Sequence, residues 1–151
     1  DVIRTPNVST ETESPASTEG LRSLSYAGIG CAYRVHGELG PGFLESVYEN
    51  ALAIELGAAG LRVSRQVPLT VHYRGTPVGQ YVADMVVDER LILEIKAVRT
   101  IAPEHEVQLV HYLTATGMDH GLLINFGPSV QVKHKYRQPS QMQPAPDRRN
   151  T

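Results

Sequence analysis

Charged residues interrupt two strongly apolar runs in residues 81–98, and this feature constrains the fold more than any other in the chain. Asp84 has apolar neighbours on both sides, and Glu94 and Lys96 bracket Ile95 at the end of the next apolar run. Charges in the interior of a buried sheet cost several kcal/mol unless they are paired or bind a metal ion. A chain that needed only to fold would rarely have them there, so the three charged residues are candidates for a functional site.

Glu94 and Lys96 are two residues apart, so on a strand they share one face. Ile92 lies on that face too. The other face is also apolar, with Leu91, Leu93 and Ile95. The simpler interpretation is a solvated Glu–Lys pair on an exposed strand. Because both faces of the strand carry apolar residues and should be covered, we favour a functional pair.

The loop between the two runs decides whether Asp84 can reach Glu94. A two-residue turn would pair Val87 with Arg90 and put Glu94 on the wrong face. A three-residue loop pairs Val87 with Leu91 and sets Asp84 opposite Glu94, and this is the register that we predict. Like charges directly opposite one another destabilise a sheet that holds no cation. The register therefore implies a bound Mg²⁺ or Mn²⁺, held by oxygen ligands and several waters.

The spacing of apolar residues predicts a single mixed α/β domain over residues 21–137. Helices are expected over 21–38, from about 43 to 57 or 60, and from 103 to about 116. Strands are expected over 61–73 (interrupted at Pro68), 78–87, 90–98, 122–126 and 130–136. The apolar stripe of the second helix is expected at Leu44, Val47, Tyr48, Ala51 and Leu52. Residues 1–20 and 138–151 are rich in small polar residues and proline, and are predicted to be disordered tails.

Composition limits the class of protein. Hydrophobic residues make up 41% of the chain, which suits a globular domain, and no run approaches the roughly 18 apolar residues of a membrane span. The single cysteine, Cys31, and the lack of a signal-peptide pattern favour a cytoplasmic protein. Basic residues are in excess only towards the C-terminus, which counts against tight non-specific binding of nucleic acid.

Three polar residues on the expected helices are weaker candidates. Gln108 and Tyr112 are four residues apart and so share a helix face, although a polar edge and a core aromatic often have this spacing. Glu45 lies one turn before Tyr48, in a first turn where the helix dipole alone favours an acidic residue. By themselves these residues do not establish a site.

The motif Gly42-x-x-Glu45-x-x-Tyr48 is the signature for which the bacterial GxxExxY protein family is named. The resemblance runs from about Leu21 to Phe126, and includes the segments 65–67, 93–97 and 121–126. This family resembles the PD-(D/E)xK nuclease superfamily. The resemblance implies a restriction-endonuclease-like αβββαβ core with one extra N-terminal helix, in agreement with the order of elements predicted above.

The resemblance also implies roles for individual residues. Asp84 and Glu94 would bind the metal together with the backbone carbonyl of Ile95, and Lys96 would position or activate the water. Gln108 and Tyr112 form a Gln-x-x-x-Tyr pattern that resembles the RecB-like branch of the superfamily. In that branch an acidic residue of an early helix joins the metal site, a role that falls on Glu45. Ala83 replaces the proline of the superfamily name, at a position that carries no chemistry.

Together these patterns predict a cytoplasmic, Mg²⁺- or Mn²⁺-dependent nuclease that hydrolyses phosphodiesters of DNA or RNA. The expected partners are a nucleic acid and a second copy of the chain in a homodimer, with no membrane partner. The alternative is a non-catalytic interaction module that keeps the nuclease-like fold and binds a protein or a nucleic acid. Small size and the weak basic footprint favour that alternative. A metabolic enzyme is least favoured, because the chain has no Gly-rich phosphate loop.

Overall fold

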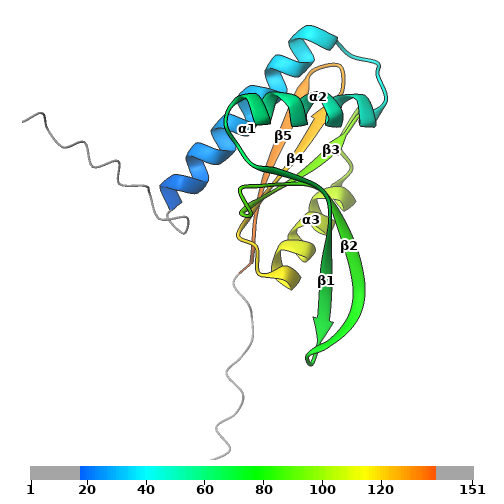
Figure 1. Cartoon of the computed structure of the whole chain (residues 1–151). Helices are drawn as coiled ribbons and strands as arrows, with labels where there is room; N and C mark the ends of the chain where they lie inside the picture. Colours follow the sequence, from blue (N-terminus) through cyan, green and yellow to red (C-terminus); the bar gives the residue numbers. More distant parts are fainter. Residues whose placement is uncertain (1–17, 139–151) are drawn as a thin grey trace, which may run out of the picture.

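The computed structural model describes residues 18–138, in which three helices and five strands alternate as α-α-β-β-β-α-β-β. The helices are α1 (Thr18–Leu39), α2 (Glu45–Ala58) and α3 (Pro103–Thr116) (Figure 1). The strands are β1 (Val63–Tyr73), β2 (Thr76–Val87), β3 (Leu91–Lys96), β4 (His120–Phe126) and β5 (Val130–Tyr136). The expected order of elements and the mixed α/β class are confirmed. The predicted tails lie almost wholly outside the described residues.

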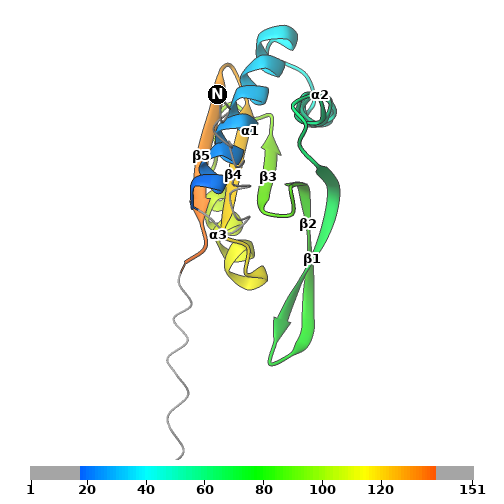
Figure 2. The same cartoon turned by 60° about the vertical axis from the view of Figure 1, so that its left-hand side comes forward.

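The five strands form one mixed sheet in the order β1-β2-β3-β4-β5. Only β3 and β4 run parallel, and α3 makes the crossover between them; the other neighbours are antiparallel. Helices α1 and α2 pack on one face of the sheet and α3 on the other (Figure 2). None of the helices within residues 18–138 is long and apolar enough to cross a membrane.

The central strand β3 is buried on both faces, as its sequence indicates. Leu91, Leu93 and Ile95 contribute to the core beneath α1 and α2, whereas Ile92 packs beneath α3. Every residue of β4 is buried beside it. Glu94 and Lys96 therefore lie on a strand whose two faces are both covered. The simpler interpretation, a solvated Glu–Lys pair on an exposed strand, is wrong.

Three details of the predicted elements are wrong. Strand β1 continues through Pro68, which pairs with Val82, because β1 is an edge strand where a missing amide hydrogen costs little. Leu44 is 77% exposed rather than part of the apolar stripe, because α2 begins one residue later and Leu44 is its N-cap. Helix α1 begins at Thr18, inside the segment assigned to the N-terminal tail.

The loop that joins α1 to α2 is fixed by Tyr48, the last residue of the GxxExxY motif. Its ring is fully buried and stacks on Phe126 with centroids 4.7 Å apart. Its hydroxyl donates to the carbonyl of Gly40 at 2.6 Å and accepts from the amide of Phe43 at 3.2 Å. Gly40 has a φ of 72°, which glycine adopts without strain. The N-terminal turn of α2 is thereby held against the end of β4.

The β1–β2 hairpin is longer than the rest of the sheet and projects from it, as both views show (Figures 1 and 2). Near the body, Val67, Leu69 and Tyr81 pack against the core beneath α3. Every residue from 72 to 80 is exposed. The projecting part is therefore held only by its own pairing and by its base.

Candidate active site

The predicted register between the second and third strands is confirmed. Val87 pairs with Leu91 and Met85 with Leu93, so the connecting loop has three residues and Asp84 falls opposite Glu94. Asp88 and Glu89 turn the loop with φ values of 49° and 60°. The Asp88 carboxylate accepts a hydrogen bond from the amide of Arg62 at 2.9 Å, which anchors the loop to the start of β1.

Beyond Met85 the ladder between β2 and β3 is replaced by bonds from side chains. The amide of Ile95 donates to Oδ2 of Asp84 at 2.8 Å. The amide of Asp84 donates to Oε1 of Glu94 at 3.3 Å. Each carboxylate thus satisfies a backbone amide that ordinary strand pairing would have satisfied. The two acidic side chains are held side by side, where the strands part.

Electrostatics at this point favour a bound cation. Burial, and then the charge of Asp84, raise the pKa of Glu94 to about 7. Burial also raises the pKa of Asp84, with the nearby Glu49 adding to it, while the Ile95 amide and the charge of Lys96 oppose the rise. Two half-buried carboxylates in contact resist joint ionisation unless positive charge lies between them. The protein supplies part of that charge through Lys96.

Lys96 is held by its neighbour on β4. It pairs in register with Asn125, whose amide side chain is completely buried. The Asn125 side chain accepts from the amide of Val98 at 2.9 Å and donates to the carbonyl of Val98 at 2.8 Å. These two bonds fix the chain where it leaves β3, so the position of Lys96 beside the carboxylates is set by the sheet.

Helix α2 brings two further carboxylates to the same region. Glu45 is exposed at the start of α2. Partial burial raises the pKa of its carboxyl, while the charge of Lys96 lowers it and that of Asp84 raises it, so Glu45 lies within electrostatic range of the predicted site. Glu49, one turn later, is only 7% exposed and accepts a hydrogen bond from the side chain of Gln66 at 3.0 Å. Sequence reasoning missed Glu49, although its spacing of four residues from Glu45 was a usable signal.

Gln66 was missed as well, and its backbone is unusual. It lies between the pairs Arg65–Met85 and Val67–Ala83, opposite Asp84, and its φ is 50°. A residue other than glycine in this left-handed region stores about 1–3 kcal/mol of strain. The hydrogen bond from the Gln66 side chain to the buried Glu49 offsets part of this strain. The unusual backbone conformation in β1 therefore lies at the candidate site.

The residues on α3 reach the carboxylates through Tyr81. Tyr81 donates a hydrogen bond to Glu94, and burial raises the pKa of its hydroxyl, which keeps it protonated. Its ring stacks on that of Tyr112 with centroids 3.4 Å apart. Gln108 donates to the Tyr112 hydroxyl at 2.8 Å. Gln108 and Tyr112 thus form one connected group with Tyr81, a residue that the sequence analysis did not single out.

The donor set suits a hard divalent cation. Asp84 and Glu94 offer carboxylate oxygens, and the backbone carbonyl of Ile95 follows directly, which is the kind of ligand that Mg²⁺ and Mn²⁺ take while keeping several waters. Within residues 18–138, no three Asp, Glu, His or Cys side chains are gathered into a ready-made metal cluster. An ion here would therefore rest on two carboxylates, main-chain oxygen and water.

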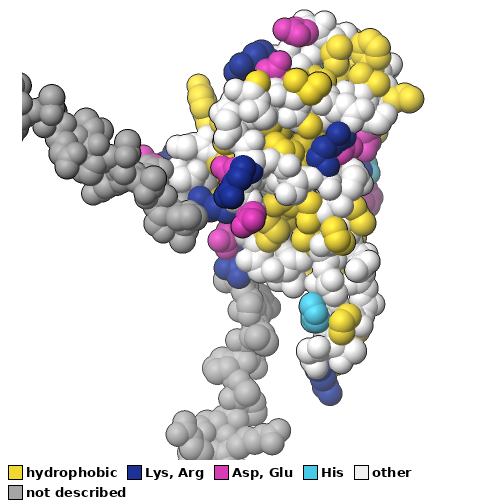
Figure 3. Space-filling view, viewed as in Figure 1, with side chains coloured by type: hydrophobic (Ala, Val, Ile, Leu, Met, Phe, Trp, Pro, Cys, Tyr) yellow, Lys and Arg dark blue, Asp and Glu magenta, His cyan; other side chains and the backbone are white. Residues whose placement is uncertain are grey.

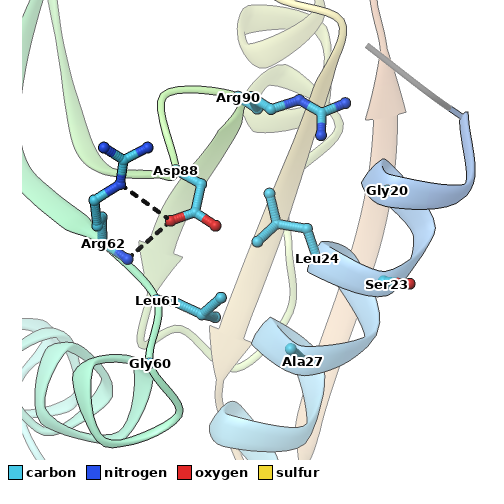
Figure 4. A pocket seen from close by; sticks show the side chains of 9 residues that line it. All are labelled: Gly20, Ser23, Leu24, Ala27, Gly60, Leu61, Arg62, Asp88 and Arg90. Atoms are coloured by element: carbon cyan, nitrogen blue, oxygen red, sulfur yellow. Dashed lines mark hydrogen bonds and ion pairs between the residues drawn. The ribbon is translucent and has the colours of Figure 1, made fainter. Parts of the chain in front are cut away.

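A separate pocket of about 540 Å³ lies at the far end of the β2–β3 loop (Figure 4). Figure 4 shows Asp88 and Arg62 together on one wall of the pocket, with Leu24 and Ala27 of α1 on the opposite wall. The pocket is lined by none of the predicted site residues. We take it as the seam between α1 and the anchored loop rather than as part of the site.

The order of elements and the placement of Asp84 on β2, with Glu94 and Lys96 on β3, define a restriction-endonuclease-like α/β domain. A family model described as the PD-(D/E)XK nuclease superfamily matches residues 22–138, and the chain belongs to this superfamily. The solved structure of SSO0001 is similar, with 16% sequence identity and a TM-score of 0.48. The similarity covers 63% of this chain but only 51% of SSO0001, about half of its length. No curated protein matches the chain.

Proposed function

We propose that the protein is a Mg²⁺- or Mn²⁺-dependent phosphodiesterase that cleaves nucleic acid. The observation that carries the proposal is the contact between Asp84 and Glu94, half-buried beside Lys96, with the pKa of Glu94 raised to about 7. A fold has little reason to hold two carboxylates in this way unless a cation joins them. Membership of a nuclease superfamily supports the same conclusion.

In this proposal Asp84, Glu94 and the carbonyl of Ile95 hold the metal. A divalent ion bound there lowers the pKa of a water and neutralises charge on a phosphate. Lys96 orients the attacking water or donates to the phosphate oxygens as their charge develops. Tyr81 keeps the Glu94 carboxylate in place through its hydrogen bond.

The helix residues have supporting roles. Glu45 joins the metal site from the start of α2 through a bound water, because no third acidic side chain is gathered beside Asp84 and Glu94 within residues 18–138. Gln108 and Tyr112 position the phosphate or the lysine, and Tyr112 braces Tyr81 through the stacked rings. These assignments follow the resemblance to the GxxExxY family and to the RecB-like branch, which we propose as the subgroup of this chain. A cytoplasmic location and a homodimer stay predictions.

A cleavage assay tests the proposal. Labelled single- and double-stranded DNA and RNA are incubated with the protein and with Mg²⁺, Mn²⁺ or a chelator. We expect cleavage of at least one substrate by the wild type with metal, and none by Glu94→Gln or with chelator. Binding without cleavage under every condition would instead favour the non-catalytic interaction module. The small excess of basic residues, confined to the C-terminal end, also favours that alternative.

A further inference from the structure

The projecting part of the β1–β2 hairpin, residues 71–79, is here called the arm. Tyr73 and Val78 are 61% and 60% exposed on it. A two-stranded ribbon with no covered face is at best marginally stable in water. An arm of this length with exposed apolar side chains does nothing for the core, which indicates a surface kept for contact with another molecule.

The charge of the hairpin indicates what that molecule is. From Val63 to Ala83 the chain has no Asp or Glu, although the whole sequence contains 16 acidic residues. Of the side chains in this segment that can carry positive charge, Arg65 pairs with Glu49 at 3.3 Å at the base of the hairpin, whereas His72 and Arg74 lie on the arm. The space-filling view shows basic and histidine side chains but no acidic ones along the projecting end (Figure 3). A surface from which carboxylates are excluded is complementary to a polyanion.

The tip of the arm is a tight turn that presents an arginine beside a tyrosine. Tyr73 pairs with Thr76, and the two residues between them, Arg74 and Gly75, have φ values of 50° and 76°. Positive φ at both positions matches the twist of a hairpin. The Arg74 guanidinium lies 5.3 Å from the centre of the Tyr73 ring. An arginine held by an aromatic ring keeps donors free for phosphate oxygens.

The arm and the candidate site lie on the same strand. From Thr76 to Asp84 strand β2 rises by about 26 Å, at roughly 3.3 Å per residue. This is about three quarters of one turn of a DNA duplex, which rises about 34 Å. The major groove of a duplex is about 12 Å wide and admits a two-stranded ribbon. A single nucleotide could not touch both places, and a convex arm offers no trough for a single strand.

We propose that the arm enters the major groove of a double-stranded DNA whose scissile phosphodiester lies at Asp84 and Glu94. This inference rests on the proposed function and names its substrate class. Arg74 and Tyr73 contact the backbone of the duplex about three quarters of a turn from the cut.

A shortened arm separates recognition from chemistry. In this variant residues 71–79 are replaced by Asn-Gly, which joins Thr70 to its partner Gln80. Binding of a fluorescent duplex of about two turns is measured in the Glu94→Gln background, and hydrolysis of bis(4-nitrophenyl) phosphate with Mn²⁺ in the wild-type background. We expect the shortened arm to bind the duplex about tenfold more weakly or worse. Its hydrolysis of the small phosphodiester should be unchanged.

A matched point variant covers the case in which the shortened chain does not fold. Tyr73→Thr with Arg74→Asn removes both tip side chains, and Asn tolerates the positive φ. Its control is Arg34→Ala, an exposed arginine on α1. The tip variant should bind the duplex more weakly and should have the same thermal melting temperature as the wild type. The control should bind the duplex like the wild type.

The possible outcomes are distinct. Duplex affinity that is unchanged in the arm variants overturns the proposal. So does a shortened arm that converts a dimer into a monomer in size-exclusion chromatography, because the arm would then bind a second copy. If the wild type hydrolyses neither substrate but its duplex binding depends on the arm, the catalytic function fails and the arm's role stands.

Discussion

The amide of Asp84 donates to the carboxylate of Glu94, and the carboxylate of Asp84 in turn accepts from the amide of Ile95, the next residue after Glu94. This reciprocal arrangement replaces strand pairing where β2 and β3 part. It keeps two acidic groups together at a cost in electrostatic energy, which burial increases. The cost should be measurable in the metal-free protein.

Replacing Glu94 by Gln should stabilise the metal-free protein above neutral pH. The folded-state pKa of Glu94, about 7, lies above its ordinary value of 4.5, so its contribution to stability is present at low pH and is lost as pH rises through 7. At pH 8 the variant should be more stable by about 1–3 kcal/mol. The difference should vanish near pH 4.5.

Urea melts of both proteins in chelator, at several pH values, measure this. A large loss of stability in the variant at pH 8 would mean that Glu94 pairs structurally with Lys96, because the change would then leave a buried, unpaired lysine.

Lys96→Met should lower the rate of cleavage by about 10²-fold or more, because it removes the positive charge beside the developing phosphate charge. Affinity for Mn²⁺ should persist, since both carboxylates remain. Lys133→Met, on the far strand β5, is the control and should cleave like the wild type. A Lys96 variant with wild-type turnover would remove this residue from the proposed chemistry.

Tyr48→Phe should cost about 1–2 kcal/mol, since the Gly40 carbonyl and the Phe43 amide both lose their partner. The N-terminal turn of α2, which bears Glu45, should loosen, so activity should fall more than stability alone explains. Tyr33→Phe, on an exposed side chain, is the matched control. Equal thermal melts for Tyr48→Phe and the wild type would show that the motif's tyrosine does not hold the loop.

His120 should make the protein sensitive to mild acid. Burial, and then the neighbouring His134, lower the pKa of His120 from 6.5 to about 4. A histidine with a lowered pKa contributes stability that is present above pH 6.5 and lost as pH falls towards 4. The loss should reach about 3 kcal/mol.

The measurement is the difference in unfolding free energy between wild type and His120→Gln across this range, with the exposed His72→Gln as control. Carboxylates also titrate in this pH range, so only the difference in unfolding free energy between the wild type and His120→Gln reports on His120. A difference that does not change with pH would contradict the account.

Local chemistry made much of the fold predictable. Pro103 and Gly117 bracket α3 as expected, the latter with a φ of 73°. The register of the second strand against the third could be predicted because only a three-residue loop sets Asp84 opposite Glu94, whereas a shift of one residue turns Glu94 to the other face. Such features depend on neighbours in sequence and can be derived from them.

What could not be predicted depends on tertiary position. Pro68 is tolerated only because β1 is an edge strand, and the sequence does not say which strand is at the edge. In the sequence Glu49 cannot be told from an ordinary exposed glutamate of a helix, because its hydrogen bond from Gln66 depends on how β1 packs on α2. The left-handed backbone of Gln66 arises where β1 meets Asp84. Likewise, two runs of strand residues predicted a hairpin, but its projection depends on where the other strands end.

Titration of the metal-free protein with Mn²⁺ in a calorimeter tests the central claim most directly. We expect the wild type to bind Mn²⁺ and Asp84→Asn to bind little. Asp88→Asn, on the anchored loop away from the site, should bind like the wild type. Equal binding of Mn²⁺ by the wild type and Asp84→Asn would contradict a metal site between Asp84 and Glu94.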